Sequence, residues 1–200
     1  GDQRQDYAWD LTLYRAESDG GRQCITGAFS TCSVTNADST VHQGVEAGFG
    51  AAVVKSLFVA GRTPDKLWLN TAYTYNDFFF DGDALYGDND LPGAPRHFLR
   101  AELLYKHPSG VYFGPNVEWV PQAYFVDNAN TLKTEGYALL GAKLGFDDGG
   151  PITAYIEGRN LTDEAYIAST SIAADLGGAD SNLFEPGNGR AVYAGVQYRW

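Results

Sequence analysis

The last eleven residues of the chain, RAVYAGVQYRW, alternate with a period of two. The positions on one side are Val192, Ala194, Val196, Tyr198 and Trp200, and those between them are Ala191, Tyr193, Gly195, Gln197 and Arg199. One side is therefore apolar up to the final residue, whereas the other carries Arg and Gln. This pattern predicts a β-strand that separates an apolar from a polar environment.

The same alternation recurs along the chain, and helical periodicity is almost absent. The chain has 200 residues, of which 44% are hydrophobic, enough for one domain with a sizeable buried surface. We therefore predict an all-β fold of eight antiparallel up-and-down strands within one domain, residues 1–200. The expected strands are residues 6–18, 40–54, 66–80, 97–105, 110–125, 137–146, 152–161 and 189–200.

Short and long connections alternate strictly between these strands. The short links are LFVAGRTPD, KHPSG and DDGGP, and the long ones cover residues 19–38, 81–96, 126–134 and 172–188. A soluble β-sandwich has no reason to alternate so regularly. A transmembrane barrel of the outer membrane does, because its periplasmic turns are short and its extracellular loops long. We therefore favour an outer-membrane barrel over a soluble all-β domain.

Aromatic residues gather where the strands meet the short links. They are Trp9, Trp68, Tyr105, Phe113, Phe146, Tyr198 and Trp200. An aromatic girdle marks the membrane interface of such barrels. The apolar face is then expected to contact the lipid bilayer, and the polar face to line the lumen.

Seven charged residues fall on the polar face. They are Glu46, Arg100, Glu102, Glu118, Lys143, Glu157 and Arg159. From the residues alone, the lumen can balance these charges between neighbouring strands.

Composition argues against nucleic-acid binding and against transmembrane helices, and it leaves the state of two cysteines open. The net charge of −11 argues against a nucleic-acid-binding protein, and no apolar run is long enough for a transmembrane helix. Cys24 and Cys32 lie in an expected loop. In an oxidising compartment they would form a disulfide worth roughly 2.5 kcal/mol; two free cytosolic thiols are the alternative.

Several stretches together resemble the C-terminal part of the barrel of a TonB-dependent outer-membrane receptor. They are TVHQGVEAGF, DLPGAPRHFLRAELLY, IEGRNLTDEAYIASTS and the final stretch, residues 186–200. The final stretch includes a terminal aromatic strand that the barrel-assembly machinery reads in this family, here Val196, Tyr198 and Trp200. Asn160 lies in the third stretch, and we expect its side chain to bond to nearby backbone.

The resemblance implies a function and a larger protein. Transporters of this kind have 22 strands and a plugged lumen, whereas this chain supplies eight strands and nothing resembling the plug. The resemblance implies energy-coupled uptake of an iron complex, either a siderophore or haem, with TonB contacted through the missing N-terminal region. It also implies that the seven charges of the polar face contact a plug or a substrate path, and charge balance within the lumen stays open as the other interpretation. A free-standing eight-stranded barrel with a structural or adhesive role is the alternative.

The long loops are acidic. Asp81, Asp83, Asp88 and Asp90 lie close together in one loop and could bind Ca²⁺, although the spacing does not fit an EF-hand. A solvated acidic loop is the simpler interpretation, and we expect no other cofactor. Acidic loops would not steer an anionic ferric complex, so either the rest of the barrel supplies basic contacts or the cargo is neutral or cationic.

An enzyme is the third class considered. A lipase-like site would need a histidine beside a serine and an orienting residue. His42 is the only histidine expected to face the lumen. We therefore predict that the protein is not an enzyme.

Overall fold

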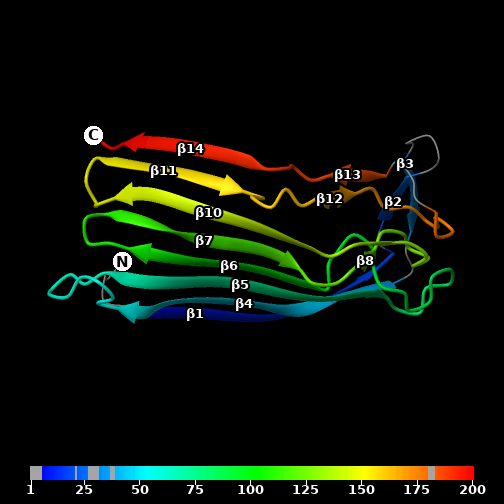
Figure 1. Cartoon of the computed structure of the whole chain (residues 1–200). Helices are drawn as coiled ribbons and strands as arrows, with labels where there is room; N and C mark the ends of the chain where they lie inside the picture. The colour runs from blue at the N-terminus through cyan, green and yellow to red at the C-terminus, as the bar shows by residue number, and fades with distance from the viewer. Residues whose placement is uncertain (1–5, 21, 27–31, 37–38, 180–182) are drawn as a thin grey trace.

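The computed structural model describes residues 6–20, 22–26, 32–36, 39–179 and 183–200. Eight long strands form one antiparallel sheet in which each strand pairs with the next along the chain (Figure 1). These strands are β1 (Tyr7–Asp19), β4 (Ser39–Lys55), β5 (Lys66–Phe80), β6 (His97–Lys106), β7 (Val111–Val120), β10 (Tyr137–Asp147), β11 (Ile152–Arg159) and β14 (Ala191–Tyr198). The prediction of eight up-and-down strands is confirmed.

The register confirms that the sheet has two unlike faces. One row runs through Leu11, Ala47, Tyr73, Leu99, Trp119 and Ala138 on adjacent strands, and the next through Asp10, Gly48, Ala72, Arg100, Glu118 and Leu139. We call the face that contains the first row the outer face and the other the inner face. Large apolar side chains on the outer face are left exposed: Leu13 is 73% and Val196 80% exposed. A soluble domain would bury such a continuous apolar surface.

The loops contain short strands that alternation did not predict. The hairpins are β2 (Arg22–Thr26) with β3 (Cys32–Asn36), β8 (Tyr124–Phe125) with β9 (Lys133–Thr134), and β12 (Ile167–Thr170) with β13 (Phe184–Pro186). The expected strand at residues 110–125 is therefore wrong in its last five residues. β7 ends at Val120, directly before Pro121, and Tyr124 belongs to a loop hairpin.

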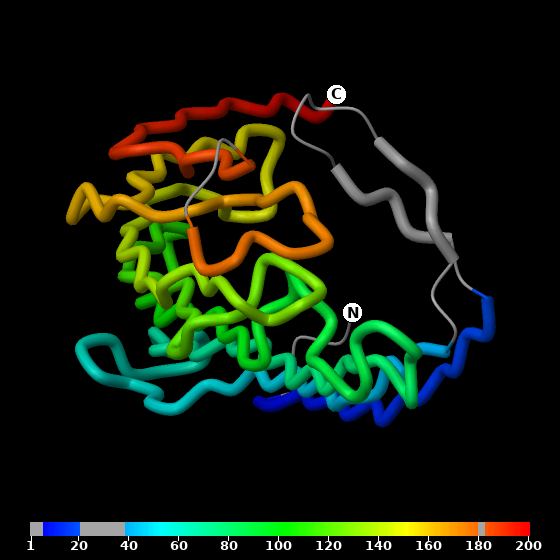
Figure 2. Tube along the Cα trace, turned by 90° about the vertical axis from the view of Figure 1, so that its right-hand side faces the viewer, coloured from blue at the N-terminus to red at the C-terminus, as the bar shows by residue number. Residues whose placement is uncertain are grey.

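The sheet curves into a wall that is left open. Figure 2 looks along the strands and shows the main-sheet strands following an arc from β1 to β14. These two strands are the edges of the sheet and do not pair with each other. No helix in the described ranges is long and apolar enough to cross a membrane. Because unpaired strand edges are not tolerated in hydrocarbon, such a wall needs further strands to complete it in a bilayer.

The short links gather at one end of the sheet and the long loops at the other (Figure 1). At the short-turn end, the Tyr105 ring contacts Phe113 and Phe58, with ring centroids 5.3 and 5.7 Å apart. Tyr105 and Phe113 belong to the predicted aromatic girdle, and Phe58, which was not predicted, joins them from a short link. Trp68 differs from the rest, because the register places it on the inner face, where its Nε1 donates to Asn70 Oδ1 at 2.7 Å.

Candidate functional site: the polar inner face

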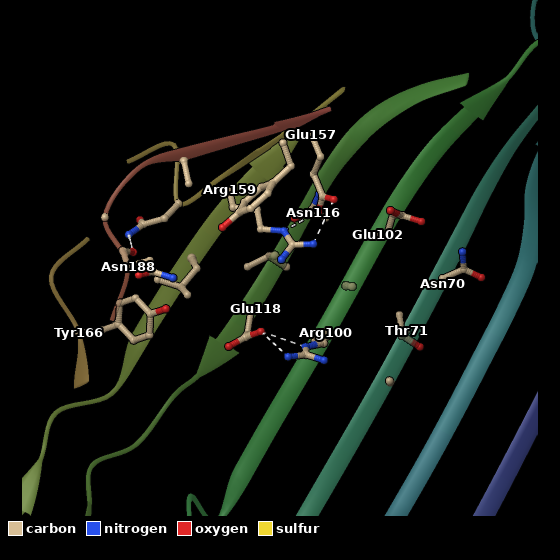
Figure 3. A pocket seen from close by; sticks show the side chains of 18 residues that line it. Asn70, Thr71, Arg100, Glu102, Asn116, Glu118, Glu157, Arg159, Tyr166 and Asn188 are labelled. Carbon is tan, nitrogen blue, oxygen red and sulfur yellow. Dashed lines mark hydrogen bonds and ion pairs between the residues drawn. The ribbon is translucent and has the colours of Figure 1, made fainter. Parts of the chain in front are cut away.

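A cavity of about 520 Å³ lies against the inner face of the sheet (Figure 3). Most of its polar lining comes from inner-face positions of β5, β6, β7 and β11, together with the segment that leads into β14. The labelled residues are Asn70, Thr71, Arg100, Glu102, Asn116, Glu118, Glu157, Arg159, Tyr166 and Asn188. Five of the seven predicted inner-face charges therefore line one cavity.

Arg100 on β6 and Glu118 on β7 are register partners and form an ion pair. Arg100 Nε and Nη2 both donate to Glu118 Oε2, at 2.9 and 2.8 Å. Tyr137 Oη donates to the other carboxylate oxygen at 3.3 Å. The Arg100 side chain is 66% exposed, so this pair is screened by water and can exchange partners at little cost.

Glu102 and Lys143 pair across an intervening strand. Lys143 Nζ on β10 donates to Glu102 Oε2 on β6 at 3.0 Å. The register partner of Lys143 on β7 is Gly114, which has no side chain to obstruct the reach across that strand. Both side chains are more than 70% buried, at 27% and 21% exposed, so each depends on the other for neutralisation.

Glu157 and Arg159 pair within β11. Arg159 Nε donates to Glu157 Oε1 at 3.1 Å, and its guanidinium lies over the Tyr193 ring at 4.8 Å. Glu46, also on the inner face, lies outside the 520 Å³ cavity and has no ion pair within the described ranges. Six of the seven predicted charges are thus paired with one another.

Sequence reasoning missed the amides of this cavity. Asn116 lies at an inner-face position between Glu102 and Gly141, and its buried Nδ2 has no hydrogen-bond partner within the described part of the chain. Asn160 Oδ1 accepts from Glu164 N at 2.8 Å, and its Nδ2 donates to the backbone oxygens of Glu164 and Asn188. The local backbone bonding expected of Asn160 is confirmed, and it also ties the end of β11 to the segment before β14.

A second cluster that the sequence did not indicate holds the long loops together. The buried carboxylate of Asp127 accepts hydrogen bonds from Thr131 N and Oγ1, from Leu132 N and from Leu176 N. Burial alone would raise the pKa of this carboxyl, but these bonds outweigh burial and hold the pKa below its ordinary value. Asn89 Nδ2, in the loop at residues 81–96, donates to Asn128 O at 2.9 Å and so joins that loop to the cluster.

The acidic loop does not gather its carboxylates. Asp83 Oδ1 accepts from Leu85 N and Tyr86 N, Asp88 from Gly82 N, and Asp90 from Arg96 at 2.6 Å. No group of three or more potential metal-ligating side chains occurs in the described ranges. Calcium binding by Asp81, Asp83, Asp88 and Asp90 stays a prediction, one that would require these bonds to rearrange.

Three other predicted features can be placed. Cys24 pairs with Val34 and Cys32 with Thr26 in the β2–β3 hairpin, but their side chains lie outside what the structure describes, so the disulfide stays a prediction. Val196 and Tyr198 lie on the outer face of β14, with Ala154 and Ile152 as register partners. Trp200 follows the strand and is fully exposed. Their role in barrel assembly stays a prediction.

The apolar outer face, the polar inner face and the alternation of short turns with long loops define an integral β-barrel wall of the outer membrane. A family model described as TonB dependent receptor-like, beta-barrel, matches residues 3–161. The chain therefore belongs to the TonB-dependent receptor family, whose members are outer-membrane proteins of Gram-negative bacteria and transporters rather than enzymes. The His42 ring, considered above for a lipase, contacts Phe78 at 4.9 Å between centroids.

Solved structures agree with this fold. The copper transporter OprC is 17% identical with a TM-score of 0.72, and covers 97% of this chain and 29% of its own. The ferric citrate transporter FecA is 20% identical with a TM-score of 0.71, and the match covers 97% of this chain and 29% of FecA. The ferric yersiniabactin uptake receptor FyuA from Yersinia pestis is 16% identical with a TM-score of 0.67, and the match covers 98% of this chain and 28% of FyuA. The chain thus spans less than a third of the length of each. At these identities the likeness concerns the fold.

Proposed function

We propose that this chain forms the C-terminal part of the barrel wall of a receptor that imports an iron complex, either a siderophore or haem, with energy supplied through TonB. The family membership and the iron receptors among the similar structures support this proposal. The plug and the TonB contacts would come from a part of the receptor outside this chain.

The observation that carries the proposal is the set of paired charges around the inner cavity. An exposed pair such as Arg100–Glu118 contributes little stability. It can therefore open to a charged group of a plug or a passing ligand. The more buried Glu102–Lys143 pair would instead hold the wall in shape. The two kinds of pair suit a lumen in which part of the surface changes partners during transport.

The long loops offer few basic side chains to an anionic cargo. Arg96 is already bonded to Asp90, and Lys133 lies over the Phe125 ring at 4.2 Å. An anionic ferric complex would thus need basic contacts from the rest of the receptor. A neutral or cationic cargo would not, and a copper transporter is among the similar structures.

The test compares uptake by a strain that lacks the full-length receptor with uptake after complementation. Radiolabelled ferric siderophores, haem and copper are supplied in turn, with and without a functional TonB. We expect one iron complex to enter only when both the receptor and TonB are present. Uptake of copper alone would overturn the iron cargo, and uptake independent of TonB would overturn the energy coupling.

The inner-face role is tested in the same strain with Arg100→Ala and Arg159→Ala introduced together in the full-length receptor. We expect a loosened plug, seen as increased entry of a large antibiotic that the intact outer membrane excludes. Arg15→Ala is a matched control, because Arg15 also forms an exposed ion pair, with Glu17, but lies outside the cavity. Unchanged antibiotic entry and uptake in the double variant would count against the plug contact.

A further inference from the structure

Three of the chain's five lysines lie side by side at the short-turn end of the wall. Lys55 on β4 pairs with Lys66 on β5, and Lys66 pairs with Lys106 on β6. Like charges directly opposite each other on neighbouring strands destabilise a sheet. Three adjacent lysines therefore destabilise this end of the sheet unless negative charges lie beside them, although the chain as a whole has a net charge of −11. We call these residues the lysine row.

A β-bulge brings the first lysine into the row. The register between β4 and β5 shifts between Ala52 and Val54, so that Val53 is an extra residue. Without this shift, Lys55 would share the outer face with Phe49 and Ala51. With it, Lys55 stands beside Lys66, which shares the inner face with Trp68 and Asn70. Bulges commonly re-aim a side chain in this way.

The inner-face placement of the row is supported by its contacts. The Lys106 ammonium lies 5.3 Å from the centroid of the Trp68 ring, whose Nε1 is bonded to Asn70 on the inner face. The lysine row therefore borders the periplasmic mouth of the lumen rather than the lipid-facing surface. An anion held there would come from the aqueous side.

A carboxylate of the chain itself already contacts the lysine row. The Asp6 carboxylate, just before β1, forms an ion pair with the Lys55 ammonium. The hydrogen bond from Lys55 holds the pKa of the Asp6 carboxyl below its ordinary value, and the charge of Lys66 acts in the same direction. One peptide carboxylate thus already occupies one end of the row.

The other two lysines of the row have no ion-pair partner in the part of the chain that the structure describes. Within the described ranges, neither Lys66 nor Lys106 forms an ion pair. The adjacent Asp65 forms no ion pair with either lysine in the described ranges, and its Oδ2 instead accepts from Phe58 N and from Tyr105 Oη, both at 2.8 Å. Neighbouring strands place the lysine backbones about 4.8 Å apart. In an extended acidic segment, carboxylates on the same side repeat about every 6.8 Å, a difference that the long lysine side chains can span.

We propose that the lysine row binds an acidic peptide segment at the periplasmic mouth of the lumen, with Lys66 and Lys106 each facing a carboxylate of that segment. This contact stands apart from the identity of the cargo, so it can fail or hold independently of the proposed iron uptake.

The test couples lysines to touching carboxylates in isolated outer membranes that contain the full-length receptor. A water-soluble carbodiimide activates a carboxylate, and a lysine amine in contact displaces the activating group to form an amide. Mass spectrometry then identifies both residues of each link. We expect Lys66 or Lys106 to be linked to Asp or Glu of a segment outside residues 6–200, and the yield to fall at 1 M salt, where charges are screened within about 3 Å.

Two matched features keep the result interpretable. The Lys55–Asp6 link reports that the short-turn end is folded, and it should persist in the Lys66→Gln/Lys106→Gln variant while the other links are lost. Lys133→Gln, in a long loop, should change none of them. Recovery of Lys55–Asp6 without any link from Lys66 or Lys106 to a peptide carboxylate would overturn the proposal. So would links from these two lysines to Asp6 alone.

Discussion

Replacing Asp127 by Asn should release the long loops without disturbing the strands. The amide has the same shape as the carboxylate, and its oxygen can still accept from Thr131 N and Leu132 N, which now lie 2.9 and 3.1 Å from Oδ1. Its NH₂ group would meet two donors that now bond to Oδ2, Leu176 N at 3.1 Å and the Thr131 hydroxyl at 2.5 Å. The hydroxyl can turn and accept from the amide, but the buried N–H of Leu176 is left unsatisfied, which costs about 3 kcal/mol.

A loss of about 3 kcal/mol corresponds to a rise of about 100-fold in the local opening equilibrium. Amide hydrogen exchange on the full-length receptor measures this quantity directly. We expect faster exchange at residues 126–134 and 172–178, with unchanged exchange in β7 and β10. Asp81→Asn is the matched control, because Asp81 is an exposed acid in a neighbouring loop. A change smaller than about threefold, or an equal change in the control, would refute the role of Asp127.

Three further experiments test the roles of Asp127, of the Glu102–Lys143 pair and of Tyr105. The pKa of the Asp127 carboxyl lies below its ordinary value of 3.8, so its hydrogen bonds stabilise the loops at every pH above 3.8. Protection of the loop amides from exchange should be lost only as the pH falls through the lower pKa of the folded state; loss of protection already at pH 6 would contradict this. Lys143→Met should destabilise the barrel by about 1–2 kcal/mol by leaving Glu102 unneutralised, and adding Glu102→Gln should restore much of the loss; an additive double variant would refute the pairing. Tyr105→Phe should lower the temperature at which the barrel unfolds on heat-modifiability gels, because Asp65 loses a bond; an unchanged temperature would contradict its role in the turn.

The strands and faces could be predicted because they depend on local alternation. Leu11 and Asp10 indicate their faces without reference to any other strand. The bulge at Val53 could not be predicted, since it inserts one apolar residue into an apolar run and leaves the pattern looking unbroken. The end of β7 before Pro121 could not be predicted from the proline, because Pro115 lies within the same strand and the strand continues past it.

The candidate site was predicted as a set of charges but not as pairs. Glu102 and Lys143 lie on strands separated by β7, so the alternation within either strand does not indicate their contact. The loop cluster was missed for a related reason. Asp127 looks like any acidic loop residue until Leu176, 49 positions later, meets its carboxylate, and no local pattern encodes a meeting of that kind.

We infer that this chain is one part of the wall of a larger TonB-dependent receptor. The most direct measurement is an immunoblot of outer-membrane fractions with an antibody against this chain, prepared from cells grown with and without an iron chelator. We predict one band several times heavier than the 21.7 kDa of the chain, with an intensity that rises on chelation. A heavy band of constant intensity would contradict the iron cargo. A band at the mass of the chain itself would contradict a larger receptor and favour a free-standing eight-stranded barrel.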